Sequence, residues 1–199
     1  MRALLLGALA ALTVALSAVS ASAVTINPVG PINANGITLQ TLVVQSTGRT
    51  YTCIWRLQGQ ILVPQIPLTT ALRAIGGIFG AQVTCNEPGV TIQPLVGPLT
   101  SSAGPWTIAL TAVLNLPNPT GALFTFLNVR FRIVDPANNF FCLFTGSIGI
   151  LIQNGNPTAQ LLPSTFVATP AAGDTCPAGL ILTKGPGQYN LNPPIVIGP

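Results

Sequence analysis

Short stretches in which apolar and polar residues alternate run through most of the chain. From Tyr51 to Val63 the alternation places one set of side chains on one face and a more polar set on the other: Tyr51, Cys53, Trp55 and Leu57 against Thr52, Ile54, Arg56 and Gln58. The end of Leu123–Val134 repeats this pattern, with Arg130 and Arg132 alternating with apolar residues. A period of two is typical of a β-sheet with one buried and one solvated face.

Further strands are predicted where β-branched and apolar residues cluster between turn formers. They are Ile37–Val44, Val90–Val96, Thr107–Leu114, Phe140–Ile152, Gln160–Val167 and Ile195–Ile197. Asn, Asp, Pro and Gly form the predicted turns at 117–119, 135–139 and 154–157. The stretch Thr69–Phe79 is ambiguous, because Gly76 and Gly77 would each weaken a helix by about 1 kcal/mol, and we expect a strand or irregular structure.

These elements predict an all-β fold, either a Greek-key-like β-sandwich or a partly closed barrel of about eight to ten short strands. The chain contains 19 prolines and 20 glycines, which leaves little room for long helices. Residues 24–199 have a length that suits a single secreted β domain.

Residues 1–23 have the features of a secretory signal peptide. A basic start at Arg2 precedes an apolar run from Ala3 to Val19, and the small residues Ala21-Ser22-Ala23 follow. We expect cleavage near Ala23, no transmembrane helix in the mature chain, and a secreted or cell-surface protein.

Export would place four cysteines in an oxidising compartment, where an even number favours two disulfide bonds. The four are Cys53, Cys85, Cys142 and Cys176. Three connectivities are open, and pairing of sequence neighbours would close two loops of similar length. Without a CxxC pair or any histidine, the sequence predicts no metal site and no cofactor.

Charged residues make up only 5% of the sequence, with seven Lys and Arg, three Asp and Glu, and no histidine. The three acids, Glu87, Asp135 and Asp174, all lie in turn contexts, where such side chains cap backbone groups. No serine nucleophile has a histidine base, and the dispersed cations form no nucleic-acid stripe. The sequence therefore predicts a protein that is not an enzyme and does not bind nucleic acid.

Two tryptophans are the candidate ligand-binding residues. Trp55 shares a face with Tyr51 and Cys53, which favours packing in the core. Trp106 follows a Gly104-Pro105 turn, and packing in the core is the favoured interpretation for it as well. An exposed indole can stack on a sugar ring. The run Phe140–Phe144 places aromatic side chains on both faces of one strand, so it is either buried on both sides or has an apolar face for a partner.

The ordered set Cys53…Gly59, Thr84-Cys85, Pro105-Trp106, Cys142…Gly146 and Cys176 resembles a family of small exported bacterial proteins, the protein activators of alkane oxidation. The resemblance extends from about Gly36 to the C-terminus. It implies an extracellular or envelope-associated protein that assists growth on hydrocarbons, and it carries over no catalytic residue.

The sequence thus predicts a structural or interaction protein with an uncharged, partly apolar surface. That surface would serve self-association, adsorption to the cell envelope, or contact with a hydrophobic phase. One alternative is a carbohydrate- or ligand-binding module that uses an exposed tryptophan. Another is a small envelope β-barrel, which alternating strands permit.

Overall fold

The computed structural model describes residues 23–67, 72–98 and 104–199, and almost all of its regular structure is β-strand. The strands are β1 (Ala23–Asn27), β2 (Gly30–Gly36), β3 (Gln40–Val44), β4 (Arg49–Ile61), β5 (Gln65–Pro67), β6 (Arg73–Cys85), β7 (Thr91–Pro94), β8 (Trp106–Leu114), β9 (Gly121–Asp135), β10 (Phe140–Gln153), β11 (Thr158–Leu161), β12 (Ser164–Ala168), β13 (Ile181–Lys184), β14 (Gly187–Asn192) and β15 (Val196–Gly198). One 3-10 turn, η1 (Pro136–Asn138), joins β9 to β10.

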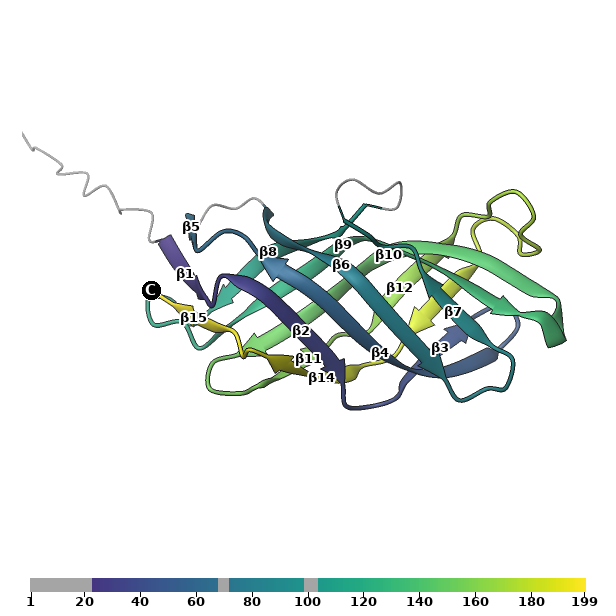
Figure 1. The fold of residues 1–199 in the computed structure, drawn as a ribbon, viewed down its shortest axis with the longest axis horizontal. Helices are drawn as coiled ribbons and strands as arrows, with labels where there is room; N and C mark the ends of the chain where they lie inside the picture. The colour runs from purple at the N-terminus through teal and green to yellow at the C-terminus, as the bar shows by residue number, and fades with distance from the viewer. Residues whose placement is uncertain (1–22, 68–71, 99–103) are drawn as a thin grey trace, which may run out of the picture.

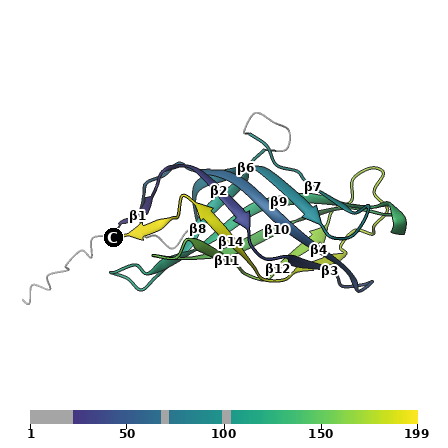
Figure 2. The ribbon, with the colours of Figure 1, turned by 60° about the horizontal axis from the view of Figure 1, so that its bottom comes forward.

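The main sheet closes on itself into a cylinder of eight columns (Figures 1 and 2). Four columns are the long strands β4, β6, β9 and β10. Each of the other four consists of two short strands in succession, namely β2 with β3, β7 with β8, β11 with β12, and β13 with β14. Ladders β2–β4 and β9–β10 complete the ring. Among the described residues β6 and β7 share no ladder, so there the ring is held by the β6–β8 pairing.

A small second sheet, in the order β15-β1-β5, extends from one end of the cylinder (Figure 1). We call this the terminal end; the turns from β8 to β9 and from β10 to β11 also lie there. The side chain of Asn154 ties the small sheet to these turns, because its amide donates to the carbonyl oxygens of both Pro119 and Ile197. The opposite end, which we call the disulfide end, contains the turns from β3 to β4, β6 to β7, β9 to β10 and β12 to β13.

The all-β fold expected from the sequence is confirmed, and so is the formation of two disulfide bonds. The bonds join Cys53 to Cys85 and Cys142 to Cys176, the pairing of sequence neighbours. Columns adjacent in the sheet are also consecutive in the chain, which is an up-and-down order rather than a Greek key. Among the two architectures expected, the pairings therefore give the barrel, and its closure removes most free strand edges.

More strands are present than the eight to ten expected, because several columns are broken in two. The predicted strand Gln160–Val167 is β11 and β12, separated at Leu162-Pro163, where proline lacks the N–H that a ladder needs. The ambiguous stretch Thr69–Phe79 contributes to β6 from Arg73 onward; residues 69–71 lie outside the described residues. A Cβ on Gly76 would collide with the carbonyl oxygen of Gln60, so glycine here permits close strand approach rather than breaking the strand.

The predicted alternation sets the inside and outside of the cylinder. In β4 the side chains of Tyr51, Trp55 and Leu57 are buried, whereas Arg56 and Gln58 are exposed. In the core, Trp55 meets the edge of Phe131 at 5.4 Å between ring centroids, and Phe131 contacts Phe166 at 4.9 Å. Such aromatic pairs add about 0.5–1.5 kcal/mol each beyond the area that they bury.

Among the described residues, no helix has the length and hydropathy needed to cross a membrane. The expected signal peptide, apart from Ala23, lies outside the described residues.

Candidate functional site

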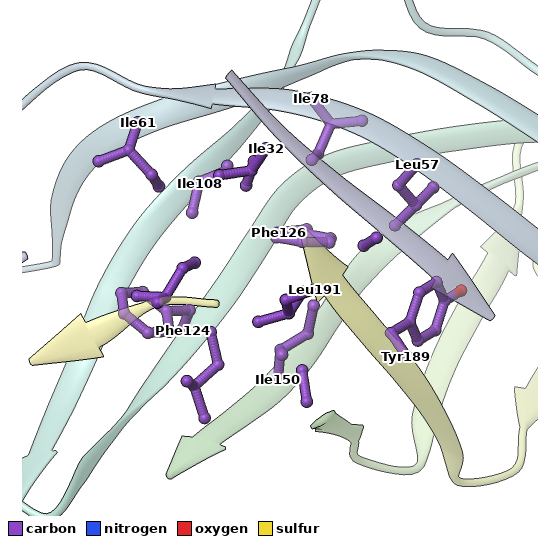
Figure 3. A pocket seen from close by; sticks show the side chains of 14 residues that line it. Ile32, Leu57, Ile61, Ile78, Ile108, Phe124, Phe126, Ile150, Tyr189 and Leu191 are labelled. Atoms are coloured by element: carbon purple, nitrogen blue, oxygen red, sulfur yellow. The ribbon is translucent and has the colours of Figure 1, made fainter. Parts of the chain in front are cut away.

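The interior of the cylinder contains an apolar cavity of about 30 Å³ (Figure 3). Aliphatic and aromatic side chains from all eight columns line it, and Tyr189 supplies the only side-chain oxygen in the lining. A water molecule needs about 10–15 Å³ of such space and polar partners, whereas pockets for small organic ligands occupy about 300–1,000 Å³. The interior of this structure is therefore a packed core with a small void, and it has no room for a ligand.

Three polar side chains are buried in the wall where β13 passes into β14. Lys184 is 1% exposed, and among the described residues its ammonium group has a single hydrogen-bond partner, the carbonyl oxygen of Gly185 at 3.4 Å. Burial lowers the pKa of Lys184 to about 7. Gln40 is fully buried, and burial raises the pKa of Tyr189, whose hydroxyl group lies near the Gln40 amide. A buried amine without a carboxylate partner destabilises the fold while it is charged.

Both tryptophans that we named as ligand-binding candidates lie in the core. Trp55 is 1% exposed and Trp106 is fully buried, and the Trp106 indole N–H donates to the carbonyl oxygen of Leu95 at 3.1 Å. Neither indole has a free face on which a sugar ring could stack. Both side chains are packed in the core, which is the interpretation that the sequence favoured.

All three acidic residues accept hydrogen bonds from backbone N–H groups at the disulfide end, as their turn contexts predict. Glu87 accepts from Thr52 at 2.8 Å, and Asp135 accepts from Asn138 at 3.3 Å. One carboxylate oxygen of Asp174 accepts from both Leu143, at 3.0 Å, and Ala171, at 2.9 Å. These carboxylates stabilise turns.

Two of these acids have further partners. Asp174 forms an ion pair with Arg132 at 3.2 Å, and Asp135 accepts a hydrogen bond from the Tyr51 hydroxyl at 3.1 Å. Burial and this contact with Asp135 raise the pKa of Tyr51 to about 12. The carboxylate of Glu87 lies within 4.8 Å of the sulfur atoms of Cys53 and Cys85, but those sulfurs are bonded to one another and offer no thiolate to a metal.

The outer surface carries nine exposed large hydrophobic side chains among the described residues. Five of them lie at the terminal end and form what we call the apolar cluster: Val29, Leu62, Leu72, Leu116 and Val196, each between 46% and 58% exposed. Their positions follow from the register, in which Gly30 pairs with Ile61 and Val196 pairs with Asn27.

A shallow groove of about 410 Å³ continues from the apolar cluster along the outside of β4, β6 and β8. Its walls include Leu62, Phe79, Pro98 and Pro105, and the backbone of Gly76-Gly77 contributes to its surface. Because these glycines have no side chains, the apolar rings and the leucine beside them stay accessible. The terminal end therefore gathers exposed apolar side chains that the linear sequence did not identify, and Leu62 links them to the groove.

A second outer surface was not predicted from the sequence, because the two strands that form it were not predicted. The strands β2 and β14 carry the sequences Ile32-Asn33-Ala34-Asn35 and Tyr189-Asn190-Leu191-Asn192. Asparagine is depleted in strands and common in turns, so neither segment was predicted to be a strand. The signal was the alternation itself, since an asparagine follows each buried apolar residue.

Comparisons with protein-family models, with curated proteins and with solved structures found no match for this chain. The candidate sites therefore rest on the geometry of this molecule.

Proposed function

We propose that this chain is an exported, non-catalytic interaction protein that attaches to an apolar surface through its terminal end. The surface would be a hydrocarbon phase or an apolar part of the cell envelope. The observation that carries the proposal is the gathering of five of the nine exposed large hydrophobic side chains, together with an adjoining groove, at one end of the cylinder.

The energetics of burial support attachment at this end. Fully burying a leucine or valine side chain contributes about 1.5–3 kcal/mol, so five half-exposed side chains could contribute about 5 kcal/mol on adsorption. The opposing cost is low, because all three acids lie at the other end and Arg73 is the charged residue nearest to the cluster. Arg73 is therefore the one charged side chain near the cluster in the described part of the chain, and its length can keep the guanidinium group in water while the cluster is buried.

Two further observations agree with this function. Two disulfide bonds suit an oxidising compartment outside the cytoplasm. The resemblance to protein activators of alkane oxidation favours a hydrocarbon as the apolar phase. Because the interior of the cylinder is filled with side chains, the proposal assigns the function to the outer surface.

Adsorption to hexadecane droplets in buffer tests the proposal. The test variant is Leu62→Ser/Leu116→Ser/Val196→Ser. The matched control, Ile37→Ser/Leu39→Ser/Val167→Ser, removes three side chains of similar exposure that lie away from the terminal end. We expect the protein concentration at half-maximal adsorption to rise about tenfold or more in the test variant and less than threefold in the control.

The proposal would be contradicted if the wild-type protein stayed in the aqueous phase. It would also be contradicted if the test and control variants lost adsorption equally. Sedimentation of the wild-type protein provides a separate outcome. If the apolar cluster is buried in a stable dimer that does not adsorb to droplets, self-association replaces surface attachment as the role of this end.

A further inference from the structure

The outer face of four adjacent strands, β14, β2, β4 and β6, is covered by carboxamide side chains. The ladders place them in two rows that run across the strands. One row is Asn190, Asn35, Arg56 and Gln82, and the other is Asn192, Asn33, Gln58 and Gly80. We call this surface the amide face; it lies on the side wall of the cylinder, apart from the apolar cluster.

The amide face is hollowed. A depression of about 280 Å³ is lined by side chains from both rows, and all of its carboxamide residues are exposed: Asn33, Asn35, Gln58, Gln82 and Asn192. Gly80 helps to form it, because a Cβ at this position would lie 3.0 Å from Oε1 of Gln58. The missing side chain leaves room for the Gln58 amide to lie along the strand.

Several asparagine side chains elsewhere in the described part of the molecule have structural partners. Asn154 holds the small sheet through Pro119 and Ile197, Asn138 donates to Asp135, and Asn115 donates to Thr120 as part of a turn. In contrast, the side chains of the amide face form no hydrogen bond with other described residues. Their donors and acceptors are hydrated and available to a ligand.

The chemistry of these side chains limits the ligand. A carboxamide offers both a donor and an acceptor, which matches a hydroxyl group, itself both donor and acceptor. Arg56 is the one charged residue in the two rows, too little for the phosphate backbone of a nucleic acid or for an acidic peptide. An apolar partner would leave the amides without hydrogen bonds at a cost of about 1–3 kcal/mol for each buried group.

We propose that the amide face binds a neutral polysaccharide through hydrogen bonds to its hydroxyl groups, with Arg56 as a central donor. The inference goes beyond attachment to an apolar surface and uses a different part of the molecule. Neighbouring strands are about 4.8 Å apart and successive outward residues of one strand about 6.8 Å apart, so the two rows form a grid of polar groups. A chain of sugar units can contact such a grid repeatedly, which compensates for weak individual contacts.

This mode of binding differs from the tryptophan-based alternative that the sequence suggested. Trp55 and Trp106 take no part in it, since both are buried. Recognition depends on carboxamides whose position on a single face only the strand register reveals.

Affinity electrophoresis in gels that contain a polysaccharide tests the proposal. The probes are dextran and hydroxyethylcellulose, which are neutral, and alginate, which is acidic. The test variant is Asn35→Ala/Gln58→Ala. The control, Gln93→Ala/Gln153→Ala, removes two exposed glutamine side chains on other parts of the cylinder. We expect a neutral polysaccharide to retard the wild-type protein and the control, and its affinity for the test variant to fall about tenfold.

A folded wild-type protein that neither neutral polysaccharide retards would overturn the proposal, as would equal affinity losses in the two variants. Retardation by alginate alone that disappears in 0.3 M salt (about 6 Å screening length) would also overturn it, because the formal net charge of +4 would then be the cause. Failure here leaves adsorption to hexadecane unchanged, so this proposal and the proposed function can fail separately.

Discussion

The two ends of the cylinder differ in what holds them and in what they expose. The disulfide end contains both disulfide bonds, all three acidic residues and the ion pair between Arg132 and Asp174. Within the described residues, the terminal end has no disulfide bond and no acid, and its exposed side chains include the five-residue apolar cluster.

This difference shows how a chain with few charges distributes them. At the disulfide end each carboxylate lies beside a turn and accepts at least one backbone N–H, from the turn itself or from a neighbouring strand, which would otherwise lack a partner. At the terminal end short turns and the small sheet satisfy the backbone without carboxylates. Among the described residues that end consequently has no carboxylate side chain, and Arg73 is the one charged residue there whose desolvation would oppose contact with an apolar surface.

The largest expected effect lies between the two ends, at Lys184. Its pKa of about 7 in the folded protein lies below the ordinary value of 10.5, so between these pH values the unfolded chain binds more protons and stability rises with pH. The destabilisation is complete below pH 7 and amounts to about 5 kcal/mol.

Urea unfolding at pH 6 and pH 9.5 measures this effect. We expect wild-type protein to be several kcal/mol more stable at pH 9.5, and Lys184→Met to be more stable than wild type at pH 6 with much weaker pH dependence. If the two proteins show the same pH dependence, Lys184 does not limit the stability of the wall between the ends.

The second prediction concerns the cross-link at the disulfide end. Replacement of the bridge by Cys142→Ser/Cys176→Ser should lower the free energy of unfolding by about 3–4 kcal/mol, because it frees a loop with a sequence separation of 34. Adsorption to hexadecane should not change under conditions in which the variant stays folded. Loss of adsorption by this folded variant would show that the two ends are not independent.

The third prediction concerns Asp174, whose side chain is 2% exposed. Asp174→Ala leaves the backbone N–H groups of Leu143 and Ala171 without their acceptor, and we expect a loss of about 2–3 kcal/mol in thermal or urea unfolding. Asp174→Asn keeps an acceptor oxygen and should lose less. Equal losses in the two variants would mean that the charge, rather than the capping of the backbone, stabilises this turn.

The smallest effect on stability is expected at the terminal end. Leu62 is 58% exposed, so Leu62→Ser should change the free energy of unfolding by no more than about 0.5 kcal/mol while it weakens adsorption. Urea unfolding and droplet adsorption of the same preparation check both parts. A large loss of stability would show that this leucine supports the fold. The terminal end would then not differ from the disulfide end in having side chains that serve attachment rather than stability.

Much of the fold could be predicted where alternation and β-forming residues coincide, as in Tyr51–Val63 and Leu123–Val134. The strands β2 and β14 could not, because their outward positions are asparagines that also favour turns. Both strands become stable only as neighbours in the ring, where their inward residues Ile32 and Leu191 join the core. The amide face was therefore missed together with the strands that carry it.

The sequence by itself determined the all-β class, the inward and outward faces of the long strands, and the turn roles of Glu87, Asp135 and Asp174. These depend on local chemistry, namely a period of two and carboxylates beside turn residues. The tertiary structure decided which cysteines pair, how the sheet closes, and where exposed groups gather. Register between strands distant in the chain sets those features, and it brings Val29 near Leu62 and Asn35 beside Arg56.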